Sequence, residues 1–313
     1  MLQSRRSFQI LSLTAVTGVL VLSACGGGGT SSGGGAPTVT SSESGGSSSG
    51  STPSVSKDDA LAAMVPSAIA SDGVISVGTD ATYAPSEFLA ADGKTVQGFD
   101  VDLFKAVAQK LGLEAKFTSA PFGNIIPSVE SGKYEIGVSS FTVNPDRLKT
   151  VDMVSYYMAG TAWATKKGNP SGIAQDNACG KRVAVQKATV QVDDITKRST
   201  DCTSAGKPAI TIDQYQGQDQ ATASVVSGKD DAMLADSPVI AYAVKQTNGQ
   251  LEQLGNIYEA APYGYVTKKG SMPFDQALSG AVDALIKDGT YKKILDNWGV
   301  GAGAVTVAQI NQP

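Results

Sequence analysis

Residues 139–147, with the sequence SSFTVNPDR, carry three hydroxyl groups a few residues ahead of a lone arginine. The hydroxyls belong to Ser139, Ser140 and Thr142, and the guanidinium belongs to Arg147. Several small donors beside one guanidinium are suited to a ligand-binding site. The alternative is structural: a strand ends, turns through the Asn-Pro pair and continues into a helix whose arginine faces solvent.

The sequence contains no histidine, which limits the chemistry available to the chain. Ser-His and Cys-His nucleophiles and histidine-bound metals are excluded, so any acid–base catalysis would fall to carboxylates, lysines or tyrosines. The formal net charge of -4 gives no reason to expect nucleic acid as a partner. We expect no metal, no cofactor and no catalytic residue.

The elements that must position the hydroxyl run follow an alternation of strands and helices. A strand is expected at 73–79, and a helix at 98–113 with Asp100 as its cap. The apolar stripe of this helix consists of Phe99, Leu103, Val107 and Leu111. Further strands are expected at 114–120, 134–140, 181–186, 209–212 and 231–236. Further helices are expected at 124–132, 190–198, 220–228, 237–246 and, as one amphipathic region, 274–300. This alternation predicts an α/β fold with a largely parallel sheet.

Two segments of the chain align without a gap, SGKYEIGVSS at 131–140 and SGKDDAMLAD at 227–236. Each lies in the second half of its own strand–helix unit, and a chain of 313 residues has room for two lobes of about 100–150 residues each. The alignment places Ser140 opposite Asp236, both at the carboxyl end of a predicted strand, where open α/β sheets bind ligands. We expect these two residues to line opposite walls of one cleft. The alternative is a chance match of two short segments.

Two extended segments, GTAWATKKG at 160–168 and YGYVTKKG at 263–270, share an ending and bracket the second unit. They are the expected crossovers, leaving the first lobe and returning to it, and the final helices would then pack on that lobe. The predicted boundaries are 57–164 for the first part of lobe 1, 165–264 for lobe 2, and 265–313 for the return to lobe 1.

The N-terminal residues 1–24 have the layout of a signal peptide. Two arginines precede an apolar run at 10–22 that is too short to span a bilayer comfortably. The run ends in LSAC, which resembles the lipobox of bacterial lipoproteins and implies cleavage before Cys25 and a lipid on its sulfur; an incidental cysteine is the alternative. SRRSFQI also resembles a twin-arginine signal, so Tat and Sec export both stay open. Residues 25–56 are rich in Gly, Ser and Thr and are expected to form a tether.

Two further cysteines, Cys179 and Cys202, remain. In an exported protein an even pair predicts a disulfide, whose loop closure would contribute ~3 kcal/mol. Two buried free thiols are the alternative.

Seven stretches in order resemble the extracellular solute-binding proteins of ABC importers for polar amino acids. They are VGTDATYAP, GFDVDLFKAVAQKLG, PFGNIIPSVESGKYEIGVSSFTVNPDR, KRVAVQKATVQ, DDAMLADSPV, APYGYVTKKG and DGTYKKILDNWG. The resemblance runs from about residue 57 to the C-terminus, and the lipobox, tether and cysteine pair resemble the Gram-positive, actinobacterial type of the family. It implies a two-lobe periplasmic-binding-protein-like (type II) fold, each lobe a mostly parallel sheet flanked by helices, with two hinge crossovers.

The same resemblance implies roles for the site residues. Arg147 would bind the ligand carboxylate, helped by hydroxyls and backbone amides of the run that contains Ser139, Ser140 and Thr142. Asp236 would bind the ammonium. The family's Gly-Thr-Thr-like turn corresponds to Ala188, Thr189 and Val190, of which only a backbone contribution from Val190 follows with safety. The side-chain pocket would consist of Asp80, Tyr83, Phe122 and Gln186. Ser86 stands where the family often has an aromatic residue, and the identity of the amino acid stays open.

The implied function is a non-enzymatic receptor, monomeric and lipid-anchored at the outer face of the membrane. It would deliver a polar amino acid to a permease with its ATPase. One alternative is an enzyme on the same scaffold, of the cyclohexadienyl or prephenate dehydratase type, with Asp80 or Glu87 as the candidate acid. Another is a tethered amino-acid sensor.

Overall fold

The computed structural model describes residues 55–313. Within this range an eight-stranded sheet has the order β5-β1-β6-β11-β7-β10-β8-β9, and β2, β3 and β4 form a small second sheet. The predicted signal peptide, Cys25 and nearly all of the tether lie outside the described residues. No helix within residues 55–313 is long and apolar enough to cross a membrane.

The strands and helices occur in the alternating order that the sequence predicts. The strands are β1 (Val74–Thr79), β2 (Thr82–Tyr83), β3 (Glu87–Leu89), β4 (Val96–Gln97), β5 (Glu114–Ser119), β6 (Ile136–Gly137), β7 (Val151–Lys166), β8 (Arg182–Gln186), β9 (Thr211–Tyr215), β10 (Ala232–Asp236) and β11 (Leu251–Lys268). The α-helices are α1 (Asp59–Ala62), α2 (Ser67–Ala70), α3 (Phe99–Lys110), α4 (Phe122–Glu130), α5 (Val190–Ser204), α6 (Gln218–Ser227), α7 (Ser237–Gln246), α8 (Met272–Asp288) and α9 (Thr290–Trp298). The 3-10 helices are η1 (Arg147–Lys149) and η2 (Gly301–Gly303).

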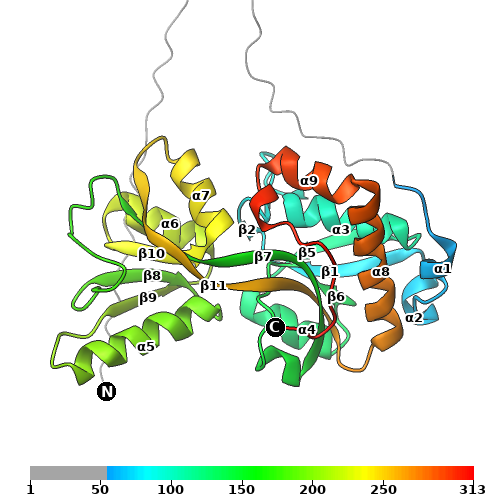
Figure 1. The fold of residues 1–313 in the computed structure, drawn as a ribbon, viewed down its shortest axis with the longest axis horizontal. Helices are drawn as coiled ribbons and strands as arrows, with labels where there is room; N and C mark the ends of the chain where they lie inside the picture. The colour runs from blue at the N-terminus through cyan, green and yellow to red at the C-terminus, as the bar shows by residue number, and fades with distance from the viewer. Residues whose placement is uncertain (1–54) are drawn as a thin grey trace, which may run out of the picture. The chain divides into compact units, whose positions relative to one another are not determined.

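The large sheet has a parallel group of strands at each end and two long antiparallel strands in its middle. At one end β1 pairs in parallel with β5 and β6, and at the other β8 pairs in parallel with β9 and β10. The middle strands β7 and β11 pair with each other and run from one group to the other (Figure 1). The two-lobe type II fold is thus confirmed. The residue at which each lobe begins and ends stays a prediction.

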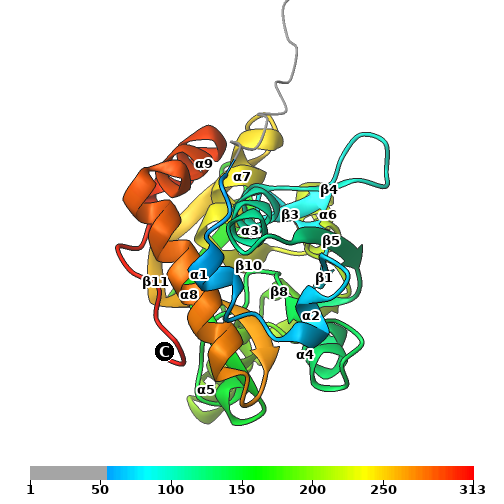
Figure 2. The same cartoon turned by 90° about the vertical axis from the view of Figure 1, so that its right-hand side faces the viewer.

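The first lobe has helices on both faces of its strands. Helices α3, α8 and α9 lie over one face, and α8 runs along the outside of the lobe (Figure 2). The predicted apolar stripe of α3, Phe99, Leu103, Val107 and Leu111, is buried in this core. Helix α4 covers the opposite face with Phe122, Ile125 and Val129. The final helices therefore pack on the first lobe, as the crossover pattern predicts.

In the second lobe, β10 is covered on both faces, which explains why its sequence is a continuous apolar run. Alternate residues of β10 point to opposite sides. Ala232 and Leu234 face the core under α5, whereas Met233 and Ala235 face the core under α6 and α7. A disulfide between Cys179 and Cys202 ties the segment before β8 to α5, with the two Cα atoms 5.6 Å apart. The predicted disulfide is confirmed.

Two local predictions are wrong, and the helix in the structural alternative for residues 139–147 is a 3-10 turn. Asp100 does not cap α3; Gly98 occupies the N-cap with φ 142, and a side chain there would collide with the Ser86 carbonyl, so Asp100 lies inside the first turn. The strand expected at 134–140 pairs only over Ile136–Gly137, because the chain leaves the ladder before Ser140, whose φ is 53. Arg147 begins a single 3-10 turn instead of an α-helix.

Candidate ligand-binding site

The candidate site lies where the carboxyl ends of parallel strands meet between the lobes. Asp80 follows β1, and the hydroxyl run follows β6. From the second lobe, Gln186 ends β8 and Asp236 ends β10. These residues surround a cavity with about 280 Å³ of space not filled by atoms, part of it open to solvent. The two strand ends that the gap-free alignment paired are therefore brought to one cavity.

All but one of the predicted ligand-binding residues line this cavity. They are Asp80, Tyr83, Phe122, Ser139, Ser140, Thr142, Arg147, Gln186, Thr189, Val190 and Asp236. Within the described residues, Ala188 is the predicted residue that does not line it, although its carbonyl accepts a hydrogen bond of 3.4 Å from Arg147 Nη2. Gln191 lines the cavity and was not predicted. Gln191 is the last residue of the stretch KRVAVQKATVQ, which carries the family resemblance. Its position there was the sequence signal that could have identified it as a site residue.

Arg147 is half-buried at the cavity and already partly bound by the protein. Its Nη1 donates to the Thr142 carbonyl at 2.8 Å. The guanidinium carbon lies 5.5 Å from the ring centre of Phe122 and 5.4 Å from that of Phe141. Burial lowers the pKa of Arg147 to about 10, so the side chain stays protonated at neutral pH. The site thus holds a rigid cation whose remaining N–H groups are available for an anionic ligand group.

The turn before α5 has a backbone conformation that favours glycine, although this chain has Ala188 there. Ala188 has φ 65, in the left-handed region that costs energy for any residue with a side chain. Thr189 is the N-cap of α5, and its hydroxyl donates to the Gln186 carbonyl at 2.8 Å instead of capping the helix. The first amides of α5, beginning at Val190, are therefore placed at the cavity as anion donors.

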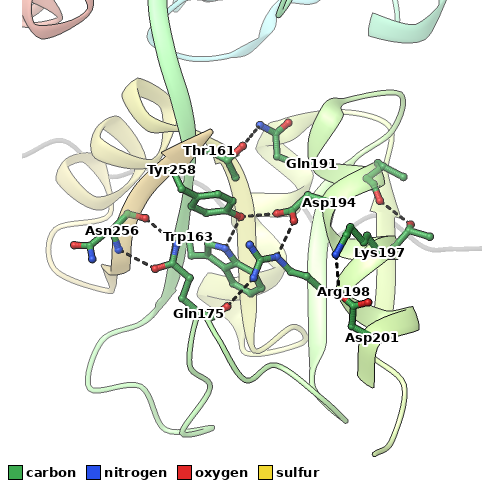
Figure 3. Close-up of polar contacts among 12 residues, drawn as sticks. Thr161, Trp163, Gln175, Gln191, Asp194, Lys197, Arg198, Asp201, Asn256 and Tyr258 are labelled. Atoms are coloured by element: carbon green, nitrogen blue, oxygen red, sulfur yellow. Dashed lines mark hydrogen bonds and ion pairs between the residues drawn. The ribbon is translucent and has the colours of Figure 1, made fainter. Parts of the chain in front are cut away.

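Asp236 is the buried acceptor on the second lobe. Its Oδ2 accepts from the Tyr83 hydroxyl at 2.8 Å, and its Oδ1 accepts from Gln191 Nε2 at 2.8 Å. The same Gln191 amide group donates to Thr161 at 3.1 Å (Figure 3). Asp236 occupies the N-cap of α7 without a capping hydrogen bond from its side chain. Burial raises the pKa of Asp236 above its ordinary value, which marks a carboxylate that a cationic ligand group would stabilise.

Asp80 is a second buried carboxylate, on the first lobe. Its Oδ2 accepts from the Phe122 amide at 2.8 Å and from Gln186 Nε2 at 3.0 Å, and its Oδ1 accepts from Thr82 Oγ1 at 2.7 Å. The contact with Gln186 joins the two lobes. Burial raises the pKa of Asp80, and the nearby Asp219 adds a smaller repulsion in the same direction. This part of the cavity therefore favours a positive charge.

Aromatic rings form apolar walls beside these charged groups. Phe122 stacks on Phe141 with the ring centres 4.6 Å apart and the planes at 19°. Tyr83 lines the cavity from the same lobe. Aromatic faces attract cations, and guanidinium groups in particular. The walls are thus compatible with a long cationic side chain.

A polar network holds α5, and with it the Val190 amide, against the long strands (Figure 3). Trp163 donates to the Tyr258 hydroxyl at 2.8 Å, and that hydroxyl donates in turn to Asp194 of α5. Arg198, one turn further along α5, donates to Asp194 at 2.7 Å and to the Gln175 carbonyl at 3.0 Å. These contacts fix the position of the helix that presents its N-terminus to the cavity.

A larger surface hollow lies elsewhere between the lobes, with about 1380 Å³ of open space. Among its lining residues, all within the described part of the chain, Lys245 is the charged side chain and there is no carboxylate. It therefore lacks a carboxylate that could neutralise an ammonium group. The described residues also hold no group of three Cys, Asp or Glu side chains arranged to bind a metal.

Proteins of known sequence resemble this chain over most of its length. The arginine-binding protein ArgT of Corynebacterium glutamicum is 38% identical over 251 residues, which cover 80% of this chain and 82% of that protein. The ABC transporter arginine-binding protein 1 of Escherichia coli is 28% identical over 229 residues, covering 72% of this chain and 90% of that protein.

Solved structures resemble it as well. An ancestral arginine-binding protein bound to arginine has a TM-score of 0.67 and 34% identity, covering 72% of this chain and 98% of that one. An ancestral amino acid-binding protein described as a precursor of cyclohexadienyl dehydratase has a TM-score of 0.67 and 32% identity, covering 74% and 97%. The sequence profile of the bacterial extracellular solute-binding proteins, family 3, matches residues 75–301. The chain belongs to the bacterial extracellular solute-binding proteins, family 3.

Proposed function

We propose that this protein is a receptor that binds a cationic amino acid, with arginine as the preferred ligand, and delivers it to an ABC importer. The observation that carries the proposal is the order of charges around one cavity. Arg147 offers a guanidinium to the α-carboxylate, Asp236 a buried carboxylate to the ammonium, and Asp80 a second buried carboxylate to the side chain. Such a ligand loses its water only if each charge meets a partner.

The relatives support this choice without deciding it. The two named above are arginine-binding proteins, and an ancestral arginine-binding protein is also known bound to glutamine. Glutamine is shorter than arginine and lacks the positive side-chain charge that Asp80 favours. The charge of the side chain is therefore the property to test.

The experiment is a thermal-shift screen of the twenty amino acids, followed by calorimetry on arginine, lysine, glutamine and citrulline. Citrulline replaces the guanidinium of arginine by a neutral urea of nearly the same shape. We expect arginine to bind with micromolar affinity or better, about -8 kcal/mol. Citrulline and glutamine should bind at least tenfold more weakly. Equal affinity for arginine and citrulline would remove Asp80 from the proposed role, and no binding of any amino acid would refute the receptor.

The dehydratase alternative has less support. Of its two candidate acids, Glu87 is fully buried beneath Ser139 and lies outside the residues that line the cavity, so it does not reach a substrate there. The relatives are named as binding proteins. Of the two candidate acids, Asp80 is the one that lines the cavity. Release of product from prephenate or arogenate by the purified protein would restore this alternative.

We place the receptor outside the cytoplasm. The family is extracellular, and the disulfide between Cys179 and Cys202 suits an oxidising compartment. A lipid on Cys25, a monomeric state and partnership with a permease and its ATPase are further parts of the proposal. A C25S variant that moves from the membrane fraction to the medium would support the anchor. An adjacent permease and ATPase in one operon would favour the transport receptor over a sensor.

A further inference from the structure

Two acidic side chains, Glu87 and Asp100, lie behind the hydroxyl run and are both 0% exposed. Glu87 belongs to β3, and Asp100 to the first turn of α3. Neither lines the cavity. Each nevertheless forms a hydrogen bond with a residue that lines the cavity, Glu87 with Ser139 and Asp100 with Ser140. The two carboxyl groups therefore position the hydroxyl run from behind.

Each carboxyl group uses one oxygen to hold the run. Glu87 Oε1 accepts from the Ser139 hydroxyl at 3.1 Å, and the same hydroxyl accepts from the Asp80 amide at 2.9 Å. Asp100 Oδ2 accepts from the amide and the hydroxyl of Ser140, at 3.0 and 3.2 Å, and also from the Tyr156 hydroxyl. These bonds hold Ser140 in its left-handed conformation, φ 53, which is costly for a residue with a side chain.

The other oxygen of each group has no hydroxyl or amide partner among the described residues. Glu87 Oε2 and Asp100 Oδ1 are both buried without a hydrogen-bond partner. The Asp100 amide donates to the carbonyl of Ser86, the residue before Glu87, at 3.1 Å, and each of the two carboxyl groups shifts the pKa of the other. Two neighbouring ionised carboxylates cannot hydrogen-bond each other, because a carboxylate is only an acceptor. One proton between the two remaining oxygens satisfies both.

Among the described residues, the titratable groups that face the pair include no positive charge that could neutralise a second anion. The titratable groups that face Glu87 are Asp80, Asp100, Tyr83 and Tyr156. Those that face Asp100 are Glu87, Tyr156, Tyr157, Tyr263, Tyr265 and Tyr291. None of them, within the part of the chain that the structure describes, is a lysine or an arginine. A pair of buried like charges at this position would be strongly unfavourable.

The hydrogen bonds indicate which group holds the proton. Asp100 accepts three bonds from protein donors and lies at the N-terminus of α3, where the helix dipole favours an anion. Glu87 accepts one such bond, from Ser139. Burial raises the pKa of Glu87 well above its ordinary value, and the neighbouring Asp100 charge adds to that rise.

We propose that Glu87 and Asp100 share one proton and act as positioning residues: neutral Glu87 donates to ionised Asp100, and the pair holds Ser139 and Ser140 in the geometry that binds ligand. The predicted effect on ligand affinity rests on the proposed function, whereas the presence of a shared proton does not depend on it. Loss of the proton at high pH would place two repelling charges beneath the run, loosen it and weaken ligand binding.

The test compares Glu87→Gln with Glu87→Ala. Glutamine reproduces a protonated glutamate, since its oxygen accepts from Ser139 and its amide group donates to Asp100; alanine leaves the Asp100 charge without that donor. We expect Glu87→Gln to bind arginine within about threefold of the unmodified protein at pH 7, and Glu87→Ala to bind it at least tenfold more weakly. Towards pH 10, the affinity of the unmodified protein should fall further than that of Glu87→Gln, since ionisation of the ligand ammonium is common to both.

Two measurements on the ligand-free protein test whether Glu87 and Asp100 share a proton, even if no amino acid binds. The infrared band of a protonated carboxyl carbonyl should be present at pH 7 and absent in Glu87→Gln. Folding takes up a proton at Glu87 once the pH exceeds the ordinary pKa of an unfolded glutamate, so the stability of the unmodified protein should fall with rising pH and that of Glu87→Gln should fall less. Asp275→Asn is the matched control, because Asp275 is another fully buried carboxyl, with its pKa raised to about 6 and a partner in Thr267 away from the cavity.

Two outcomes would overturn the pair. One is a carboxyl band at pH 7 that survives in Glu87→Gln or disappears in Asp275→Asn. The other is equal loss of affinity in Glu87→Gln and Glu87→Ala, which would mean that the run needs a charged Glu87.

Discussion

The hydroxyl of Tyr83, in the first lobe, donates a hydrogen bond of 2.8 Å to the carboxylate of Asp236, in the second lobe. The same hydroxyl accepts from the Asp236 amide at 3.1 Å. Gln186 and Asp80 form a second bond across the lobes, at 3.0 Å. Residues proposed to bind ligand thus also bind each other when the lobes are together, so ligand binding and lobe closure share the same side chains.

Tyr83→Phe should weaken arginine binding. The variant removes a donor from a buried carboxylate and a bond that exists only between closed lobes. The expected loss is about 1–2 kcal/mol, or roughly tenfold in affinity by calorimetry. Small-angle scattering should show a larger radius of gyration for the ligand-free variant.

Tyr215→Phe is the matched control, because Tyr215 also donates to an aspartate, Asp230, at 2.7 Å, but within the second lobe. It should leave affinity and radius unchanged. Equal effects of the two variants would show that the bond between the lobes has no special role in closure.

Arg147→Ala should reduce arginine affinity by about 100-fold or more, because the ligand carboxylate would be buried without its partner, at a cost of about 3–5 kcal/mol. The affinity of Arg147→Lys for arginine should lie between that of the unmodified protein and that of Arg147→Ala. An ammonium keeps the positive charge but loses the paired donors of the guanidinium. Arg182→Ala is the control: this arginine is 45% exposed in its side chain and pairs with Asp213. Calorimetry that finds unchanged affinity in Arg147→Ala would reject the role of Arg147.

Arginine affinity should fall as the pH is lowered. Burial raises the pKa of Asp236 and of Asp80 in the ligand-free protein, whereas a bound cation stabilises their ionised forms. Binding therefore releases protons when the pH is near these raised values, and affinity is lost as the pH falls through them.

Calorimetry from about pH 4 to pH 7, in two buffers of different ionisation enthalpy, measures that release. Asp236→Asn should bind weakly even at neutral pH and release fewer protons. Proton uptake on binding at acid pH would contradict the assignment of both carboxylates as cation acceptors.

Asp236 should affect the stability of the ligand-free protein in the opposite direction to its effect on affinity: its contribution to stability decreases as the pH rises. Because the folded pKa of Asp236 is raised, its contribution is present below the unfolded pKa and is lost as the pH rises through the folded one. The same carboxylate thus costs stability at neutral pH while it is available for binding. Such a cost is common at functional sites.

Much of the site could be predicted because its residues stand at strand ends. The periodicity of apolar residues locates the strands, and in an open α/β sheet the residues after them gather at one edge. Ser140 and Asp236 were paired in this way, by two segments that align without a gap. The left-handed conformation of Ala188, φ 65, was not predicted, although the resemblance places a glycine at this position.

The contacts among polar side chains could not be predicted in the same way. Glu87 and Asp100 belong to different elements, and an acidic residue early in a helix ordinarily indicates an exposed cap. Periodicity shows which face of a helix is apolar but not which polar group another element brings to it. Gln191 was missed for the same reason, because its partners Thr161 and Asp236 come from two different strands.

Arg198→Ala should lower the melting temperature by roughly 5–10 °C, equivalent to about 2–3 kcal/mol. The Arg198 and Asp194 side chains are only 29% and 10% exposed, and the guanidinium lies 5.0 Å from the Tyr258 ring centre and 5.7 Å from that of Trp163. Its removal leaves Asp194 and the Gln175 carbonyl short of a donor in a partly buried place (Figure 3).

Lys197→Ala, one residue away on α5, is the matched control. Lys197 also pairs with an aspartate one turn along, Asp201, but the two side chains are 77% and 63% exposed, and such pairs contribute less than about 0.5 kcal/mol. Calorimetric scans that show equal, small shifts for both variants would mean that the network does not hold α5. If instead Arg198→Ala alone unfolds early and also binds arginine more weakly below its transition, then the position of the α5 N-terminus depends on contacts at the far side of the helix.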